Sequence, residues 1–254
     1  MRKILAIGIG AGDPEQLTIQ AVKAMQHVDA FFVLDKGSTA AELVEVRTAM
    51  LERSVEGHPY RVVELADPPR DRASGDYHAA VQEWHARRAH IYALAIRDGL
   101  ADDECGAFLV WGDPSLYDST LRILEHVLAS GTVDFEYQVI PGITSVQALS
   151  ASQRLLLNGI GENVLITTGR RLVEDWARGV DNVVVMLDGA CSFTHLDAEG
   201  VDIFWGAYLG MPDEICLGGP LAEMSDVIQR TRAAARARKG WIMDTYVLRR
   251  RKRD

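Results

Sequence analysis

The amino-acid sequence predicts an α/β fold made of two α/β domains, and three observations carry this prediction. Short apolar runs of strand length recur and end at glycine-rich turns, as in residues 4–9 and 106–111. Segments with helical spacing of apolar residues follow most of these turns. Two of the strand–turn–helix units share the tripeptide Gly-Asp-Pro, at residues 12–14 and 112–114. Parallel strands that end in such turns place ligand sites at the carboxyl edge of a sheet, so both turns are candidate site loops.

Composition narrows the class of protein. The chain has 254 residues, of which 48% are hydrophobic and 25% charged, as in an ordinary globular protein. A net charge of -9 argues against a nucleic-acid partner that is held by overall positive charge. Cys105, Cys191 and Cys216 lack metal or disulfide spacing, which is typical of reduced thiols in a cytoplasmic protein. No apolar run approaches the ~20 residues that span a bilayer, so no membrane association is expected.

In the first half of the chain, strands and helices are expected to alternate. The first strand is followed by a helix that ends near His27, and the second strand ends at Asp35 and Lys36, where polar side chains can face a ligand. Prolines make residues 67–72 a loop. The histidines of the helix at 77–97 lack a metal-ligand pattern, so no metal site is expected. The other elements expected here are strands at 30–34 and 60–65 and a helix at 39–54.

The second half begins with a helix that follows the second Gly-Asp-Pro turn, and we expect the domain boundary at its start, giving domains 1–118 and 119–254. Hydroxyls at Thr144 and Ser145 precede a helix, where they either cap it or contact a ligand. A Gly-Gly-Pro turn is expected at 218–220. The elements expected in this half are helices at 119–128, 146–151 and 221–238, and strands at 135–140, 164–167, 183–187, 201–208 and 240–248.

A dinucleotide site is an alternative for the first turn. Gly8, Gly10 and Gly12 differ from the Gly-x-Gly-x-x-Gly spacing, and Asp13-Pro14 puts a carboxylate where a pyrophosphate needs donors. Asp35 follows the turn at about the sequence distance of a ribose-binding acid, so a nicotinamide-dependent oxidoreductase remains an alternative interpretation. Neither a phosphate-binding loop nor a Gly-x-Ser-x-Gly nucleophile motif occurs in the sequence.

Five motifs occur in order along most of the chain. They are Gly10-Ala11-Gly12-Asp13-Pro14, Trp111-Gly112-Asp113-Pro114, Pro141-Gly142-Ile143-Thr144-Ser145, Val183-Val184-Val185-Met186, and Pro212-Asp213-Glu214 before Gly218-Gly219-Pro220-Leu221. This ordered set resembles that of the S-adenosylmethionine-dependent tetrapyrrole (corrin/porphyrin) methylases. Stretches at 108–120, 166–171, 205–210 and 240–246 resemble one branch of that family, whose members also remove an acetyl group from the substrate.

The resemblance implies a homodimeric methyltransferase whose active site lies in an interdomain cleft, with S-adenosylmethionine as cofactor and no metal. The cleft would be completed by the second domain, while the first would face the tetrapyrrole. By position, the cofactor contacts fall on Trp111, Gly112, Asp113, Thr144, Ser145, Met186, Ala207, Tyr208 and Leu209. Soft apolar contact from Met186 and hydroxyls for the methionine part of the cofactor agree with this assignment.

The implied substrate is a macrocycle with many carboxylates, which arginines bind in bidentate fashion. Arg170 and Arg171 at a strand end are the first candidates and Lys36 the next, with Arg70 and Arg72 behind them. The basic run at 249–253 is expected to be a solvated tail.

Removal of an acetyl group requires a group that positions or deprotonates water. Asp13 and Asp35 are the candidate catalytic carboxylates, and Tyr117 is a further candidate. Helix capping is an equally good interpretation of Asp13 and Asp113. Another methylase of the family, or a binding module that kept the cofactor fold without catalysis, remain alternatives.

Overall fold

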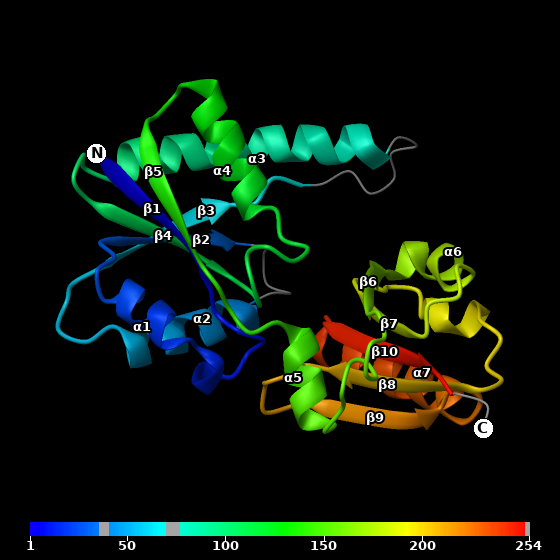
Figure 1. Cartoon of the computed structure of the whole chain (residues 1–254). Coiled ribbons are helices and arrows are strands. Elements are labelled where there is room, and N and C mark those ends of the chain that lie inside the picture. The colour runs from blue at the N-terminus through cyan, green and yellow to red at the C-terminus, as the bar shows by residue number, and fades with distance from the viewer. Residues whose placement is uncertain (36–40, 70–76, 252–254) are drawn as a thin grey trace. The chain divides into compact units, whose positions relative to one another are not determined.

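The protein is represented by a computed structural model that describes residues 1–35, 41–69 and 77–251 (Figure 1). The chain forms two compact units, Met1–Ile143 and Thr144–Asp254, and each has its own five-stranded sheet. The predicted α/β class is therefore confirmed. The first unit extends past the boundary expected at residue 118, because its last strand pairs along the first strand of the chain over six residues.

The first unit is a parallel sheet with strand order β3-β2-β4-β1-β5. Its central strand is buried from Ile4 to Ile7, and both of its neighbours run parallel to it. Strands covered on both faces are continuously apolar, which explains the short hydrophobic runs in the sequence. The elements are β1 (Arg2–Gly8), η1 (Pro14–Gln16), α1 (Ile19–Met25), β2 (Ala30–Asp35), α2 (Ala41–Ser54), β3 (Arg61–Ala66), α3 (Tyr77–Gly99), β4 (Cys105–Val110), α4 (Thr120–Ser130) and β5 (Phe135–Ile140).

Two helical layers cover this sheet, as Figure 1 shows. On one face, α3 and α4 contribute residues such as Tyr92 and Leu124 to a core that includes Phe108. On the other face, α1 and α2 contribute Met25 and Met50 to a second core. The strands thereby hold the loops at their carboxyl ends on a rigid frame, which is what a site built from loops needs.

The second unit has a mixed sheet with strand order β6-β7-β10-β8-β9. The last strand of the chain, β10, lies in the centre of this sheet, antiparallel to both β7 and β8. Only β6 and β7 are parallel to each other. The elements are α5 (Ser145–Ser152), β6 (Leu165–Thr168), η3 (Gly169–Arg171), α6 (Leu172–Trp176), β7 (Asn182–Met186), η4 (Ser192–His195), β8 (Val201–Ala207), β9 (Ile215–Pro220), α7 (Leu221–Lys239) and β10 (Asp244–Arg250).

One expectation for the second unit is wrong, and one of its helices was not expected. The segment expected as a Gly-Gly-Pro turn is the end of β9, where Gly218 pairs with Phe204 and Gly219 with Ile203. A proline is tolerated there because β9 is an edge strand and the proline is its last residue. The short helix α6 was not expected from the sequence pattern.

The start of the basic C-terminal run is not a solvated tail. Arg249 and Arg250 belong to β10, and the Nε of Arg249 donates to Asn182 Oδ1 over 3.1 Å. The guanidinium of Arg250 lies 4.0 Å from the ring centroid of Trp176. These arginine stems cover the apolar edge of the unit, so the run is partly structural. Residues 252–254 lie outside the described residues. Within the described parts of the chain, no helix is long and apolar enough to cross a membrane.

Candidate functional site

The two Gly-Asp-Pro turns lie side by side at the carboxyl edge of the first sheet. They meet because β1 and β4 are neighbouring parallel strands that end at the same level. The N-H of Gly112 donates to the carbonyl of Gly10 over 2.8 Å, and the two glycines form an isolated antiparallel bridge. Gly10 and Gly112 have φ angles of 79° and 66°, which glycine adopts without strain. The tripeptides thus belong to one structure rather than to two independent loops.

A third loop, after β5, packs against this pair without room for side chains. A Cβ added to Gly142 would lie 2.1 Å from the carbonyl oxygen of Gly112, and one added to Gly8 would lie 2.6 Å from the amide nitrogen of Gly142. Backbone therefore contacts backbone where β4, β1 and β5 end. Such close approach leaves peptide groups, rather than side chains, as the surface that a ligand can contact.

Asp113 ties these loops together. Its Oδ2 accepts from the N-H of Gly142 over 2.8 Å, and its Oδ1 accepts from both the N-H and the hydroxyl of Ser115. Burial raises the pKa of Asp113, but these hydrogen bonds outweigh it and hold the pKa below the usual value. Asp113 does not cap α4, because that helix starts at Thr120, whose N-H donates to Asp118.

Asp113→Asn should lower the free energy of unfolding by about 1–2 kcal/mol at neutral pH, because one side of the amide is a donor that faces the N-H of Gly142. The folded-state pKa of Asp113 is depressed, so the wild type has this stability above the usual carboxylate pKa and loses it as pH falls through the folded-state value. Urea unfolding of both proteins between pH 7 and pH 3 measures the difference. A difference that stays constant down to pH 3 would contradict the role of the charge.

One carboxylate oxygen of Asp13 has a local structural role, and the other is available to a ligand. Its Oδ1 accepts from the N-H of Glu15 over 2.8 Å at the start of η1, whereas α1 is capped by Thr18. The capping interpretation thus holds for the short helix η1. The side chain is half-buried, and its Oδ2 has no protein partner in the described part of the chain.

In the second unit, sheet register brings several of the expected cofactor residues together. Met186 ends β7 and lies opposite both Thr168 of β6 and Thr245 of β10. The hydroxyl of Thr245 is 2.9 Å from the hydroxyl of Ser145, the first residue of α5. A thioether and three hydroxyls therefore gather at one edge of this sheet. Neither Thr168 nor Thr245 was singled out from the sequence, because strand pairing over long sequence distances is needed to find them.

Thr144 is a helix cap in this structure. Its hydroxyl accepts from the N-H of Val146 over 3.1 Å, and Gln147 reaches back to the N-H of Thr144, which forms a capping box. The Thr144 hydroxyl also contacts Oε1 of Gln147. The structural interpretation that the sequence left open is thus confirmed for Thr144, although its backbone remains at the same edge as Ser145.

Ala207 ends β8 at this edge, Tyr208 and Leu209 follow it, and all three residues are buried. Tyr208 has a φ of 51°, which is uncommon outside glycine, and its N-H donates to the carbonyl of Met243 over 3.0 Å. Its hydroxyl donates to the carbonyl of Trp241 over 2.7 Å. A Cβ added to Gly206 would lie 2.7 Å from the Leu209 side chain. The segment is therefore fixed in one conformation and offers mainly backbone groups to a ligand.

The carboxylate of Asp188 organises the loop after β7. It is buried and accepts from the N-H groups of Ala190 and Ser192, the hydroxyl of Ser192, and the hydroxyl of Tyr246 over 2.6 Å. Burial and the neighbouring carboxylate raise the pKa of Tyr246 above its usual value, so its hydroxyl stays a donor. Asp188 was noticed in the sequence only as the end of a strand, because its partners come from a distant strand.

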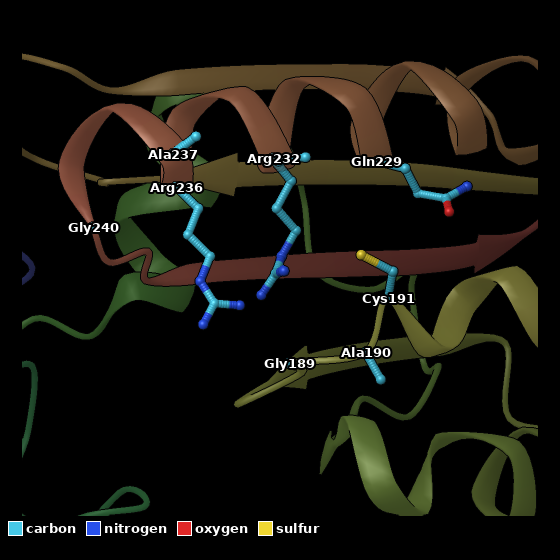
Figure 2. Close-up of a pocket in the computed structure, with 9 residues that line it drawn as sticks. Gly189, Ala190, Cys191, Gln229, Arg232, Arg236, Ala237 and Gly240 are labelled. Carbon is cyan, nitrogen blue, oxygen red and sulfur yellow. The ribbon is translucent and has the colours of Figure 1, made fainter.

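A shallow pocket of about 590 Å³ lies between α7 and this loop, lined by Gly189, Cys191, Arg232 and Arg236 among others (Figure 2). Figure 2 shows both arginines extending from α7 in the same direction. Arg232 forms an ion pair with Asp244, with 2.8 Å between Nε and Oδ2. Burial lowers the pKa of Arg232, but the interaction with Asp244 raises it by more, so the pKa lies above its usual value. Arg236 lies in the last turn of α7, where a cation stabilises the helix dipole.

Among the described residues, those expected to bind substrate or to act in catalysis lie on separate segments of the two units. Arg170 and Arg171 lie in η3, directly after β6, and both are exposed. Arg171 forms ion pairs with Glu174 and Asp175 at 3.6 and 3.5 Å. Tyr117 has a φ of 52° and is 43% exposed in the loop after β4. Asp35 ends β2, but its side chain is outside the described residues, as are Lys36, Arg70 and Arg72.

Comparison with known proteins identifies the fold and the family. Residues 3–225 match the family Tetrapyrrole (Corrin/Porphyrin) Methylases. A relative from Sinorhizobium sp., named precorrin-6A synthase (deacetylating), is 51% identical over 249 residues, which cover 98% of this chain and 95% of the relative.

Solved structures agree with this match. The crystal structure of a cobalamin synthesis related protein (CobF) from Corynebacterium diphtheriae has a TM-score of 0.85 at 41% identity and covers 99% of this chain and 100% of its own. A uroporphyrin-III C-methyl transferase from Thermus thermophilus, complexed with S-adenyl homocysteine, has a TM-score of 0.60 at 19% identity, with 97% and 96% covered, and thus shares the fold. Together with the ordered motifs, these matches show that the chain belongs to the tetrapyrrole (corrin/porphyrin) methylases.

Proposed function

We propose that this chain is an S-adenosylmethionine-dependent C-methyltransferase of cobalamin biosynthesis that converts precorrin-5 into precorrin-6A. It would methylate C-1 of the macrocycle and release the acetyl group at that position as acetate. The observation that carries the proposal is the 51% identity, over nearly the full length of both chains, to the precorrin-6A synthase (deacetylating) of Sinorhizobium sp.. A cytoplasmic location fits three cysteines that carry no disulfide.

S-adenosylmethionine would supply the methyl group. We assign its binding in the first unit to Trp111, Gly112 and Asp113, where three loops present backbone groups and a carboxylate held ionised by its hydrogen bonds. In the second unit we assign Ser145, Met186 and the backbone of Thr144 and of residues 207–209, which lie at one sheet edge. A carboxylate and carbonyl oxygens stabilise a sulfonium cation, and a thioether offers adenosine a soft apolar contact.

The protein needs no nucleophile of its own for the methyl transfer. Water adds to the acetyl carbonyl, the bond between that carbonyl carbon and C-1 breaks, and acetate leaves. The electron pair that stays on C-1 then takes up the methyl group in line with the departing sulfur. Alignment and exclusion of water are therefore the main requirements for the second step. The first step requires a base or a group that positions water.

The direct test is to incubate the protein with precorrin-5 and methyl-labelled S-adenosylmethionine, and then to measure the macrocycle mass and the released acetate. One methyl group gained and one acetate released per macrocycle are expected. Methylation without acetate would identify another corrin-ring methylase of the family. Binding of S-adenosylhomocysteine without turnover would favour the non-catalytic binding module. Binding of NAD in preference to S-adenosylhomocysteine would favour the oxidoreductase alternative.

We assign the positioning of water to Asp13, whose Oδ2 has no protein partner within the described ranges, with Asp35 and Tyr117 as the further candidates. Asp13→Asn keeps an acceptor for the N-H of Glu15 and removes the base. Acetate release should fall by roughly 10²-fold or more, while affinity for S-adenosylhomocysteine stays within twofold. Glu15→Gln, at an exposed neighbour, is the matched control. Undiminished acetate release by Asp13→Asn would transfer the role to Asp35 or Tyr117.

Macrocycle carboxylates are assigned to Arg170 and Arg171, with Lys36 as a further candidate. Both follow β6 directly in η3, and Arg171 also forms ion pairs with Glu174 and Asp175. An increase in KM for precorrin-5 in Arg170→Met, without a change in kcat, is the expected result. An unchanged KM would remove Arg170 from the substrate site.

We also propose a homodimer. Leu156 and Ile160, on the loop after α5, are 78% and 106% exposed. Exposed apolar side chains that lie near one another often mark a protein–protein contact. Light scattering should give about twice the chain mass of 28.0 kDa. A monomeric mass at micromolar concentration would refute the dimer.

A further inference from the structure

Arg47 of α2 lies against Trp111, at the carboxyl edge of the first sheet. Its guanidinium carbon is 5.4 Å from the centroid of the Trp111 ring. The preceding residue, Val46, packs with Trp111 against the same buried core, which fixes the position of this part of α2. The side chain of Arg47 is half-buried, although it carries a charge.

Arg47 has no carboxylate partner among the described residues. Its Nη1 donates to the carbonyl of Leu43 over 3.1 Å, and no carboxylate of the described chain is within ion-pair distance. Burial lowers the pKa of Arg47 to about 10, and the more distant charge of Asp118 offsets this only in part. The group is therefore still protonated at neutral pH, with its charge poorly compensated.

The two fully buried arginines of the described residues are paired with carboxylates. Arg88 forms two hydrogen bonds to Asp67, at 2.7 and 2.5 Å, and Arg232 binds Asp244. Half-buried Arg249 and Arg250 have amide or carbonyl oxygens as acceptors instead. Arg47 lies at the edge where ligand loops converge, and there a ligand carboxylate would supply the charged partner that Arg88 and Arg232 have within the protein.

The indole N-H of Trp111 is a second donor in need of an acceptor, beside the Arg47 guanidinium. Trp111 Nε1 is buried and has no hydrogen-bond partner in the described structure. An indole N-H can only donate, as can a guanidinium, so both groups require an acceptor. A buried donor without an acceptor is costly, so the Trp111 indole N-H, on a ring that contacts the Arg47 guanidinium, indicates a missing acceptor.

We propose that Arg47 and the indole N-H of Trp111 form a subsite for a ligand carboxylate. The inference rests on the proposed function for the identity of the ligand, because both a side chain of the tetrapyrrole and the methionine part of the cofactor carry this group. The guanidinium would bind the carboxylate as a fork, and the indole would donate a further hydrogen bond. Arg47 was not singled out from the sequence, since α2 shows no motif around it.

The test uses three variants of the full chain. Arg47→Met removes the charge and keeps most of the side-chain volume, and Arg47→Lys restores the charge without the fork. Arg53→Met makes the same change at an exposed arginine of the same helix and is the matched control. Calorimetric titrations use uroporphyrin I as a stable polycarboxylate tetrapyrrole, S-adenosylhomocysteine, and methylthioadenosine, which lacks the amino-acid carboxylate.

If the macrocycle supplies the carboxylate, Arg47→Met should weaken uroporphyrin binding at least ~10-fold and leave S-adenosylhomocysteine within twofold. If the cofactor supplies the carboxylate, Arg47→Met should bind S-adenosylhomocysteine more weakly by that factor and should bind methylthioadenosine as the wild type does. Arg47→Lys should recover part of the loss, and Arg53→Met should behave as the wild type. Urea unfolding of each variant, without ligand, separates lost binding from lost folding.

A wild-type chain that binds neither carboxylate ligand would overturn the subsite. So would an Arg47→Met variant that binds both as the wild type does, even if it unfolds at lower urea, since Arg47 would then only stack on Trp111. Turnover of precorrin-5 by the wild type is measured separately. Loss of uroporphyrin affinity in Arg47→Met, with no precorrin-6A formed by the wild type, would keep the subsite and refute the proposed function.

Discussion

Gly142→Ala is expected to lower the rate of methyl transfer by on the order of 10²-fold and to destabilise the first unit by about 3 kcal/mol. The added Cβ would lie 2.1 Å from the carbonyl oxygen of Gly112 and 2.8 Å from the backbone of Gly8. These neighbours are backbone atoms at the ends of three paired strands, so they cannot rotate away as a side chain would. Relief requires the loops to separate, and this breaks the hydrogen bond from the Gly142 N-H to Asp113.

Activity should fall even under conditions where the variant remains folded. A displacement of about 1 Å in the loops that align two reacting carbons costs on the order of 10²-fold in rate. Gly99→Ala is the control in the same unit, because its Cβ would meet Phe32 at an ordinary 3.5 Å. Both variants are compared by urea unfolding, by titration with S-adenosylhomocysteine and by turnover. A Gly142→Ala protein with wild-type affinity and stability would show that the loops are not held as closely as described.

The first unit was predictable because its signals are local. Its central strands β1 and β4 are buried and appear in the sequence as continuous apolar runs, and each of the two is followed by a glycine turn. The capping residue of α1, Thr18, precedes it in sequence, as capping residues do. The ordered motifs then assigned most of the cofactor residues through resemblance, since a spacing pattern alone does not choose between S-adenosylmethionine and a dinucleotide.

The second unit was less predictable because its signals are not local. The strand β9 reads as a turn, with two glycines and a proline in six residues, and becomes a strand only by pairing along β8. The insertion of β10 between β7 and β8 depends on the return of the chain after α7. Pairing of this kind is set by tertiary context, which outweighs the intrinsic preference of a short segment.

Interactions that support the site were missed for the same reason. The glycine contacts at Gly8 and Gly142 require the register of three strands, and the unpaired state of Arg47 requires knowledge of every neighbour. Asp188 is recognisable as a strand end, but its partner Tyr246 is 58 residues away. Sequence patterns therefore indicated candidate ligand contacts more readily than the residues that hold the loops in position.

Asp188→Ala is expected to have the second large effect, a loss of roughly 3–5 kcal/mol from the unfolding free energy. Its side chain accepts four hydrogen bonds, and their removal leaves the Ser192 groups and the Tyr246 hydroxyl as buried donors without an acceptor. A typical domain has about 5–15 kcal/mol of net stability, so the variant should be only marginally folded.

The effect should also reach Met186, to which we assign a cofactor contact. Leu187 and Cys191, on either side of Asp188, both have a φ of 55°, a conformation that non-glycine residues keep only when their surroundings fix it. Once the carboxylate is gone, this loop can relax, and Met186 at its start loses its fixed position. Affinity for S-adenosylhomocysteine should therefore fall at least ~10-fold in Asp188→Ala, measured at a temperature where the variant is folded.

Tyr246→Phe separates the two consequences. It removes one donor and leaves the other three hydrogen bonds of Asp188 in place, so it should cost about 1–2 kcal/mol and little cofactor affinity. In the double variant Asp188→Ala/Tyr246→Phe, the Tyr246→Phe change should lower the unfolding free energy less than it does alone. The reason is that Asp188→Ala has already removed the acceptor of the Tyr246 hydroxyl. Additive losses would mean that the hydroxyl and the carboxylate act independently. A Tyr246→Phe variant that loses cofactor affinity as strongly as Asp188→Ala would assign the positioning of Met186 to β10 rather than to the Asp188 loop.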